Sequence, residues 1–191
     1  MNEILEKLES EIKKRAISND EVSQILLSIP EMTNRRIIFG YASVSIIDRE
    51  NQKISIPALK EAVKRFMAES DFRLVNIFHS DVSLGRILPQ WTNPRTGKIY
   101  KTEVDHIGWK VVAEIRDDIE LADKVWAEIQ KGNIRSFSIA GTSKKKHMSH
   151  EQGKVFDEID EMDLFEATLC TVPVCSAAIF EMLWDPNKVT I

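Results

Sequence analysis

The order of strand-like and helix-like segments most constrains how this chain can fold. Segments rich in β-branched and aromatic residues follow one another without regular alternation with helices. We count about six or seven strands and three or four helices. This order favours an α+β fold with a mostly antiparallel sheet or barrel. The principal expected strands lie at residues 36–47, 72–79, 86–88, 108–115, 134–140 and 164–172.

Two internal segments carry apolar residues at helical spacing. The first follows Pro57, which suits the first turn of a helix, and continues to about residue 69. The second spans residues 118–131 and ends before Gly132, a typical C-cap glycine. The apolar faces are Leu59, Ala62, Val63, Phe66 and Met67 in the first helix, and Leu121, Val125, Trp126 and Ile129 in the second.

The length of 191 residues suits one domain with a sizeable core, preceded by a helical segment. Residues 1–34 are expected to form this amphipathic segment, with an N-cap signal at Ser18 and Glu21. We expect the domain at 35–185 and a polar C-terminal tail at 186–191.

Overall composition excludes several classes of protein. The net charge of −4 argues against a nucleic-acid-binding protein, which usually carries a basic face. No apolar run approaches the roughly 20 residues that span a bilayer, and the charged N-terminus is not a secretory signal. Two cysteines, Cys170 and Cys175, are too few for a disulfide framework. These features favour a reducing, intracellular setting.

Three further segments lead to local predictions. Gly40, inside the first strand, indicates a bulge or a close approach of another backbone. The lysine-rich residues 144–150, with Gly153 after them, are expected to form a mobile polar loop. Residues 177–184 are expected to form a short helix or turn.

The chemistry centres on the pattern Ser-x-Ser-x-x-Gly within residues 135–142. A serine nucleophile needs a base, usually an imidazole, to take its proton, and a third group to orient that imidazole. His79, Ser138 and Glu166 supply one of each in apolar strand contexts. From the residue types alone, each of the three also fits a purely structural role. Ser136 is a second candidate nucleophile on the same strand.

Other kinds of site find little support. A zinc site would have to combine the four residues His147, His150, Cys170 and Cys175, whose spacing is loose. The acidic run 157–163 lacks the glycine and the spacing of a calcium loop. No phosphate-binding or dinucleotide-binding fingerprint occurs. We therefore expect neither a metal nor a cofactor.

Four blocks of the sequence, in the same order, resemble the prohead (capsid maturation) serine proteases of tailed phages. The resemblance covers about residues 36–180. The blocks are residues 40–48 with the helix at 58–67, His79 with Gly85, residues 132–141, and residues 164–173 followed by Ala177.

The last block also looks like a strand of the herpesvirus assemblins, in which a second histidine takes the place of Glu166. That family has a closed β-barrel wrapped by helices and a Ser-His-His triad. The resemblance implies the same barrel here. It also implies His79 as general base and acid, Ser138 as nucleophile and Glu166 as the group that orients the histidine.

The sequence departs from these families near the serine. Ala140 stands where a glycine is commoner, and the arginine pair that follows the last assemblin strand is absent after Pro173. We therefore expect backbone N–H groups near Ala140 and Gly141 to stabilise the oxyanion. Ser136 remains the alternative nucleophile.

The resemblance also implies a biological role. The substrates would be scaffold and major capsid proteins, and the enzyme itself, cleaved inside an assembling procapsid in the host cytoplasm. Related folds suggest a homodimer or higher oligomer, without membrane or nucleic acid as a partner. The alternative is a catalytically inactive structural or scaffolding virion protein with the same fold, which Ala140 and the long N-terminal segment motivate.

Overall fold

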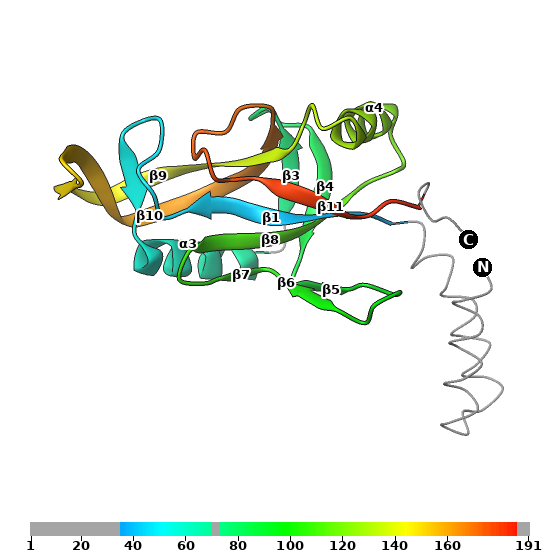
Figure 1. Cartoon of the computed structure of the whole chain (residues 1–191), viewed down its shortest axis with the longest axis horizontal. Coiled ribbons are helices and arrows are strands. Elements are labelled where there is room, and N and C mark those ends of the chain that lie inside the picture. Colours follow the sequence, from blue (N-terminus) through cyan, green and yellow to red (C-terminus); the bar gives the residue numbers. More distant parts are fainter. Residues whose placement is uncertain (1–34, 70–72, 187–191) are drawn as a thin grey trace, which may run out of the picture.

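The computed structural model describes residues 35–69 and 73–186, which form an α+β fold made mostly of strands (Figure 1). The expected helical segment at 1–34 and most of the expected tail lie outside the described residues. The strands are β1 (Arg36–Val44), β2 (Gln52–Ile54), β3 (Leu74–Ile77), β4 (Ser83–Leu88), β5 (Gln90–Thr92), β6 (Ile99–Lys101), β7 (Glu103–Val104), β8 (Gly108–Ile115), β9 (Ser136–Glu151), β10 (Lys154–Cys170) and β11 (Phe180–Trp184). The helices are α3 (Ile56–Ala68) and α4 (Glu120–Gln130).

A nine-stranded sheet forms the body of the domain. Its order is β11-β1-β8-β4-β3-β10-β2, with β7 also paired to β8 and β9 also paired to β10. All pairs are antiparallel except those of β10 with β2 and with β3. The strands β5 and β6 form a separate hairpin. The prediction of a mostly antiparallel α+β fold is therefore confirmed.

Strand β9 and the segment just before β11 meet at one place, but the sheet does not close there into a continuous barrel. An isolated antiparallel bridge joins Ser136 of β9 to Ile179, supported by a 3.0 Å hydrogen bond from Phe137 N–H to the Ala178 carbonyl. The preceding segment turns away, because Ala178 N–H bonds back to the Cys175 carbonyl. On the edge of β9 that faces away from β10, this bridge is followed by no further ladder among the described strands. The expected closed barrel is therefore not confirmed.

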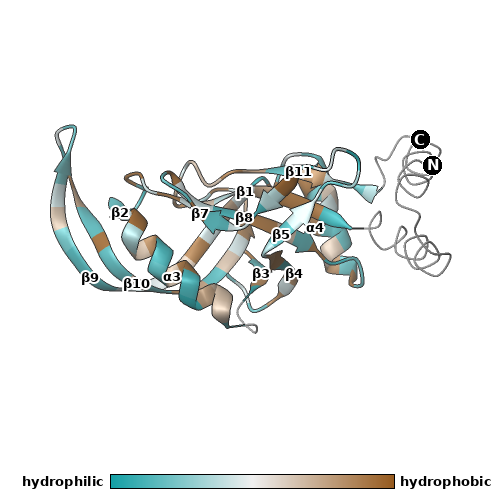
Figure 2. Cartoon of the chain, turned by 90° about the horizontal axis from the view of Figure 1, so that it is seen from below, coloured by the Kyte–Doolittle hydropathy of each residue, from teal (hydrophilic) through white to brown (hydrophobic). Residues whose placement is uncertain are grey.

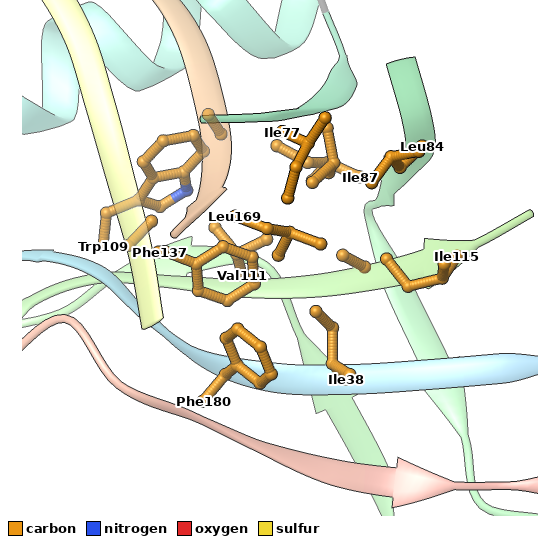
Figure 3. Close-up of a cluster of buried hydrophobic side chains, with 14 of the residues drawn as sticks. Ile38, Ile77, Leu84, Ile87, Trp109, Val111, Ile115, Phe137, Leu169 and Phe180 are labelled. Atoms are coloured by element: carbon orange, nitrogen blue, oxygen red, sulfur yellow. The ribbon is translucent and has the colours of Figure 1, made fainter. Parts of the chain in front are cut away.

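The main hydrophobic core lies on the inner side of the curved sheet. Side chains from seven different strands converge there (Figure 3). Both helices add their apolar faces to this core, and Phe66 of α3 packs edge-to-face on Trp109 of β8 with ring centroids 5.6 Å apart. The residues labelled in Figure 3 are Ile38, Ile77, Leu84, Ile87, Trp109, Val111, Ile115, Phe137, Leu169 and Phe180.

Helix α3 agrees with the prediction from sequence. It begins after Ser55, whose hydroxyl accepts a hydrogen bond from Ala58 N–H, and Pro57 lies in its first turn. Its buried face consists of Ala58, Leu59, Ala62, Val63 and Phe66.

Helix α4 differs from the prediction in one side chain. Leu121, expected inside, is 43% exposed, because Ala122 continues the buried stripe in its place. Gly132 follows the helix with a φ of +78°, which confirms the expected glycine stop. Within the described ranges, neither helix is both long and apolar enough to cross a bilayer.

The expected mobile loop at 144–153 is instead part of a long hairpin, so that prediction was wrong. Strands β9 and β10 contain 16 and 17 residues and are joined by a tight turn at Gln152 and Gly153, both with positive φ. The distal half projects from the body and is mostly hydrophilic (Figures 1 and 2).

Charge complementarity across the hairpin explains why a polar segment is ordered there. Lys146 pairs with Asp157 at 2.7 Å and Lys144 with Asp163 at 2.6 Å. The hydrogen bond from the Lys144 ammonium group lowers the pKa of the Asp163 carboxyl. The basic run of β9 thus lies opposite the acidic run of β10, and cross-strand pairs of this kind stabilise a ladder.

The segment 177–184, expected to be a short helix or turn, contains strand β11. It pairs with β1, and Gly40 lies directly opposite Phe180. A Cβ atom on Gly40 would lie 2.1 Å from the Ile179 carbonyl oxygen. The predicted close backbone approach at Gly40 is therefore confirmed.

Replacing Gly40 by alanine should lower the free energy of unfolding by about 1–3 kcal/mol, because the added methyl group displaces the Ile179 backbone. Urea denaturation of the purified variant measures this. The matched control is Gly97→Asn, since Gly97 has a φ of +70° and no neighbouring atom within 4 Å of an added Cβ. Asparagine tolerates that backbone conformation. Equal stability of the Gly40→Ala variant and the wild type would contradict the close approach.

Candidate active site

Strand β10 is the scaffold of the site. Its residue Thr168 lies opposite Ser138 of β9 on one side and beside Asn76 of β3 on the other. The neighbouring side chains Phe137 and Leu169 point into the core (Figure 3). Because side chains alternate along a strand, Ser138 and Thr168 project from the opposite, outer face of the sheet. Glu166 lies two residues before Thr168 and shares that face.

His79 reaches this face through an unusual turn. Strand β3 ends at Ile77, so His79 lies just beyond the strand rather than at its end as expected. Phe78 and His79 both have positive φ, 51° and 53°, a conformation that costs non-glycine residues about 1–3 kcal/mol. Two hydrogen bonds to β10 hold the turn, from Phe78 N–H to the Leu169 carbonyl and from His79 N–H to the Thr168 hydroxyl. The turn directs the imidazole back across β10 toward β9.

The imidazole connects the two other candidate residues. Its Nε2 lies 3.2 Å from Ser138 Oγ, and its Nδ1 lies 3.2 Å from Glu166 Oε2. Both distances suit hydrogen bonds, at the long end of the range for proton transfer. The His79 side chain is 44% exposed, whereas Glu166 is mostly buried and Ser138 is only 5% exposed. The three predicted residues are therefore brought together in the order serine, histidine, carboxylate.

The second oxygen of Glu166 is also notable. Oε1 is buried and makes no hydrogen bond to any described residue, while Oε2 faces His79. A carboxylate with little contact to water is stabilised strongly by a nearby positive charge. Glu166 is thus suited to stabilise a protonated His79.

Thr168 was not identified from the sequence, yet it anchors the histidine. It is fully buried, and its hydroxyl accepts the His79 N–H at 3.1 Å. Strand alternation alone left open whether Thr168 faced solvent. Its position two residues after Glu166 was the available signal, because residues at that spacing share a face of the sheet.

The alternative nucleophile Ser136 lies elsewhere on the strand. It is buried opposite Cys170 and itself forms the bridge to Ile179, and the described residues that line the cleft beside Ser138 do not include it. Burial raises the pKa of the Cys170 thiol, against a smaller opposing effect of the Val172 N–H. A protonated, buried thiol is a poor nucleophile.

A cleft of about 330 Å³ opens beside Ser138. One wall consists of His79, of Ser143 and of β9 from Ser138 to Gly141, which includes the expected oxyanion residues Ala140 and Gly141. The opposite wall comes from the end of β1 and the following turn. The nucleophile and its base therefore lie at the edge of a space that can receive a substrate.

The residues considered for zinc do not come together. His147 and His150 lie in the outer part of the hairpin, whereas Cys170 lies at the body end of β10. His147 instead contacts Asp160 through Nδ1 at 2.7 Å. Within the described ranges, no cluster of three or more histidine, cysteine or acidic side chains is arranged to hold a metal ion.

Comparison with known proteins agrees with this geometry. No curated protein matches the sequence. A family model described as Caudovirus prohead serine protease matches residues 23–185, a range that includes His79, Ser138 and Glu166. The relation to the assemblin fold stays a prediction. Because the match covers most of the chain, the protein belongs to the caudovirus prohead serine protease family.

Proposed function

We propose that this protein is a serine endopeptidase of phage capsid maturation that uses a Ser138-His79-Glu166 triad. The observation that carries the proposal is the unbroken series of contacts from Glu166 through His79 to Ser138, which ends in an open cleft. Family membership supports the protease class, and the geometry supports these three residues within it.

In the first half of the reaction, Ser138 Oγ attacks the carbonyl carbon of the scissile peptide bond. His79 Nε2 takes the hydroxyl proton, and Glu166 stabilises the resulting imidazolium through Nδ1–H. The tetrahedral intermediate then collapses as His79 donates that proton to the leaving amine. The carbon–nitrogen bond breaks, and the acyl group stays on Ser138 as an ester.

In the second half, a water molecule replaces the departed amine. His79 takes a proton from this water as it attacks the ester, and later returns the proton to Ser138 Oγ. Glu166 keeps its negative charge throughout. Its role is to fix the tautomer and orientation of the imidazole rather than to accept the proton.

The oxyanion needs backbone donors near Ser138. Ala140 and Gly141 were expected to supply them, and both line the cleft. In β9, Phe137 N–H points away from β10, toward Ala178. Regular alternation then turns the N–H of Ala140 toward β10 and that of Ile139 toward the cleft. We therefore propose the N–H of Ile139, the residue after the nucleophile, as the oxyanion donor on this strand.

The biological substrates follow from the family. A prohead protease acts inside the procapsid, so we propose that scaffold and major capsid proteins are cleaved there, together with the enzyme itself. The inactive virion protein considered from the sequence would need no contact between His79 and Ser138. The 3.2 Å separation of Nε2 and Oγ favours the active enzyme.

Ser138→Ala should abolish cleavage of co-expressed scaffold and capsid proteins while leaving the unfolding temperature unchanged, because only the nucleophilic oxygen is lost. Ser136→Ala is the matched control on the same strand and should retain cleavage. Gel electrophoresis and mass spectrometry of the co-expressed proteins measure both. Undiminished processing by the Ser138→Ala variant would sink the proposal.

Thr168→Val should lower kcat about tenfold with little change in KM, because His79 loses the acceptor of its backbone N–H. Thr168→Ser keeps a hydroxyl and should restore most of the rate. Steady-state hydrolysis of a cleaved peptide gives both constants. If the valine and serine variants lose activity equally, Thr168 contributes through packing and not through the hydrogen bond.

A further inference from the structure

The edge of β9 beside the nucleophile has no partner strand within residues 35–69 and 73–186. On one side β9 pairs with β10 along its whole length. On the other side, the bridge between Ser136 and Ile179 is the last backbone pairing among the described strands. The free edge therefore begins next to Ser138.

The cleft begins at this edge and continues over the inner face of β10, where Ile159 and Met162 also line it. Its lining includes Ser138, which projects from the outer face of β9, and Ile139, which packs against the core on the inner face. Across the free edge the lining includes Ala42 and Ser43, at the end of β1, whereas Gln52 of β2 lines it from the far side of β10. The cleft thus occupies the gap where a closed barrel would have one more strand.

The backbone of β9 is oriented to pair across this gap. Phe137 donates its N–H to the Ala178 carbonyl, which is the partner on that side. In an antiparallel strand, every second residue directs both its N–H and its C=O to the same side. Ile139 therefore presents its backbone groups to the cleft, immediately after the nucleophile.

The charges along β9 limit where another strand can be added. Residues 139–143 are uncharged, whereas Lys144, Lys145 and Lys146 follow directly. Charged side chains, lysine above all, are a common means of blocking edge-to-edge pairing. The uncharged stretch that admits a strand coincides with the part of β9 that lines the cleft.

We propose that the substrate binds as an extended strand added to β9 along residues 139–143, filling the gap in the sheet. This inference rests on the proposed protease function. Strand addition supplies affinity through main-chain hydrogen bonds and selects sequence through alternate side chains. Every second side chain of the added strand points inward and meets Ile54, Ile159 and Met162. The site therefore accepts apolar residues at these alternate positions of the substrate.

N-methylation of the substrate backbone tests the pairing. The probe is a peptide that the full-length wild-type chain cleaves, identified from a synthetic peptide library, and its binding is measured to the Ser138→Ala variant. Methyl groups on amides that face β9 should weaken binding about tenfold each, with the effect recurring at every second residue. If the loss of affinity does not alternate from one methylated residue to the next, strand addition is overturned.

A pair of tryptophan variants tests the location. Ser143 lines the cleft, whereas Met148, in the exposed outer part of the same strand, does not. Ser143→Trp should raise KM for the same peptide about tenfold or more, because the indole occupies the path of the added strand. Met148→Trp should leave KM unchanged. Equal effects of the two substitutions would place the substrate elsewhere.

Failure of the proposed function has a different signature. If no library peptide is cleaved in a manner that depends on Ser138, the protease function itself is wrong, and strand addition is overturned with it. If cleavage depends on Ser138 but neither the alternation nor the Ser143 effect appears, only strand addition fails.

Discussion

The register between β9 and β10 is the constraint on which the site depends. It places Ser138 opposite Thr168 and positions Glu166 two residues away on the same outer face. A slip of one residue would turn Ser138 into the core and Phe137 outward. Because Phe137 and Leu169 are fully buried, core packing and catalytic geometry specify the same register. The alternation of core-facing and outward-facing side chains along these two strands therefore holds the nucleophile and the carboxylate together.

The histidine depends on a second, local constraint. His79 comes from β3, on the far side of β10 from the serine, so a straight continuation of β3 would carry it away from β9. The left-handed conformations of Phe78 and His79 reverse the chain, and hydrogen bonds to β10 hold that reversal. Strained backbone of this kind persists only where its surroundings stabilise it. Thr168 is one such group, which links a buried threonine to the position of the base.

Much of this architecture could be predicted from sequence patterns. The alternation of residues 109–115, the stripe of α3 and the pairing of Ser138 with His79 and Glu166 all followed from spacing and residue chemistry. The β9–β10 hairpin did not, because the polar run from Lys144 resembles a loop until its acidic partner strand is known. The expected closure of the sheet into a barrel is not confirmed, and the reason is again a contact between distant parts of the chain. Closure depends on where the segment before β11 turns away, and a residue distant in sequence also contacts that segment, through the hydrogen bond from Arg49 N–H to the Val174 carbonyl.

The central claim is that Ser138 is an activated nucleophile, and covalent labelling tests it most directly. The native full-length protein is treated with diisopropyl fluorophosphate, and the modified residue is located by peptide mass spectrometry. The account predicts one diisopropylphosphoryl adduct, on Ser138, that disappears in a His79→Ala variant of unchanged fold. An adduct on Ser136, or labelling of Ser138 that persists without His79, would contradict it.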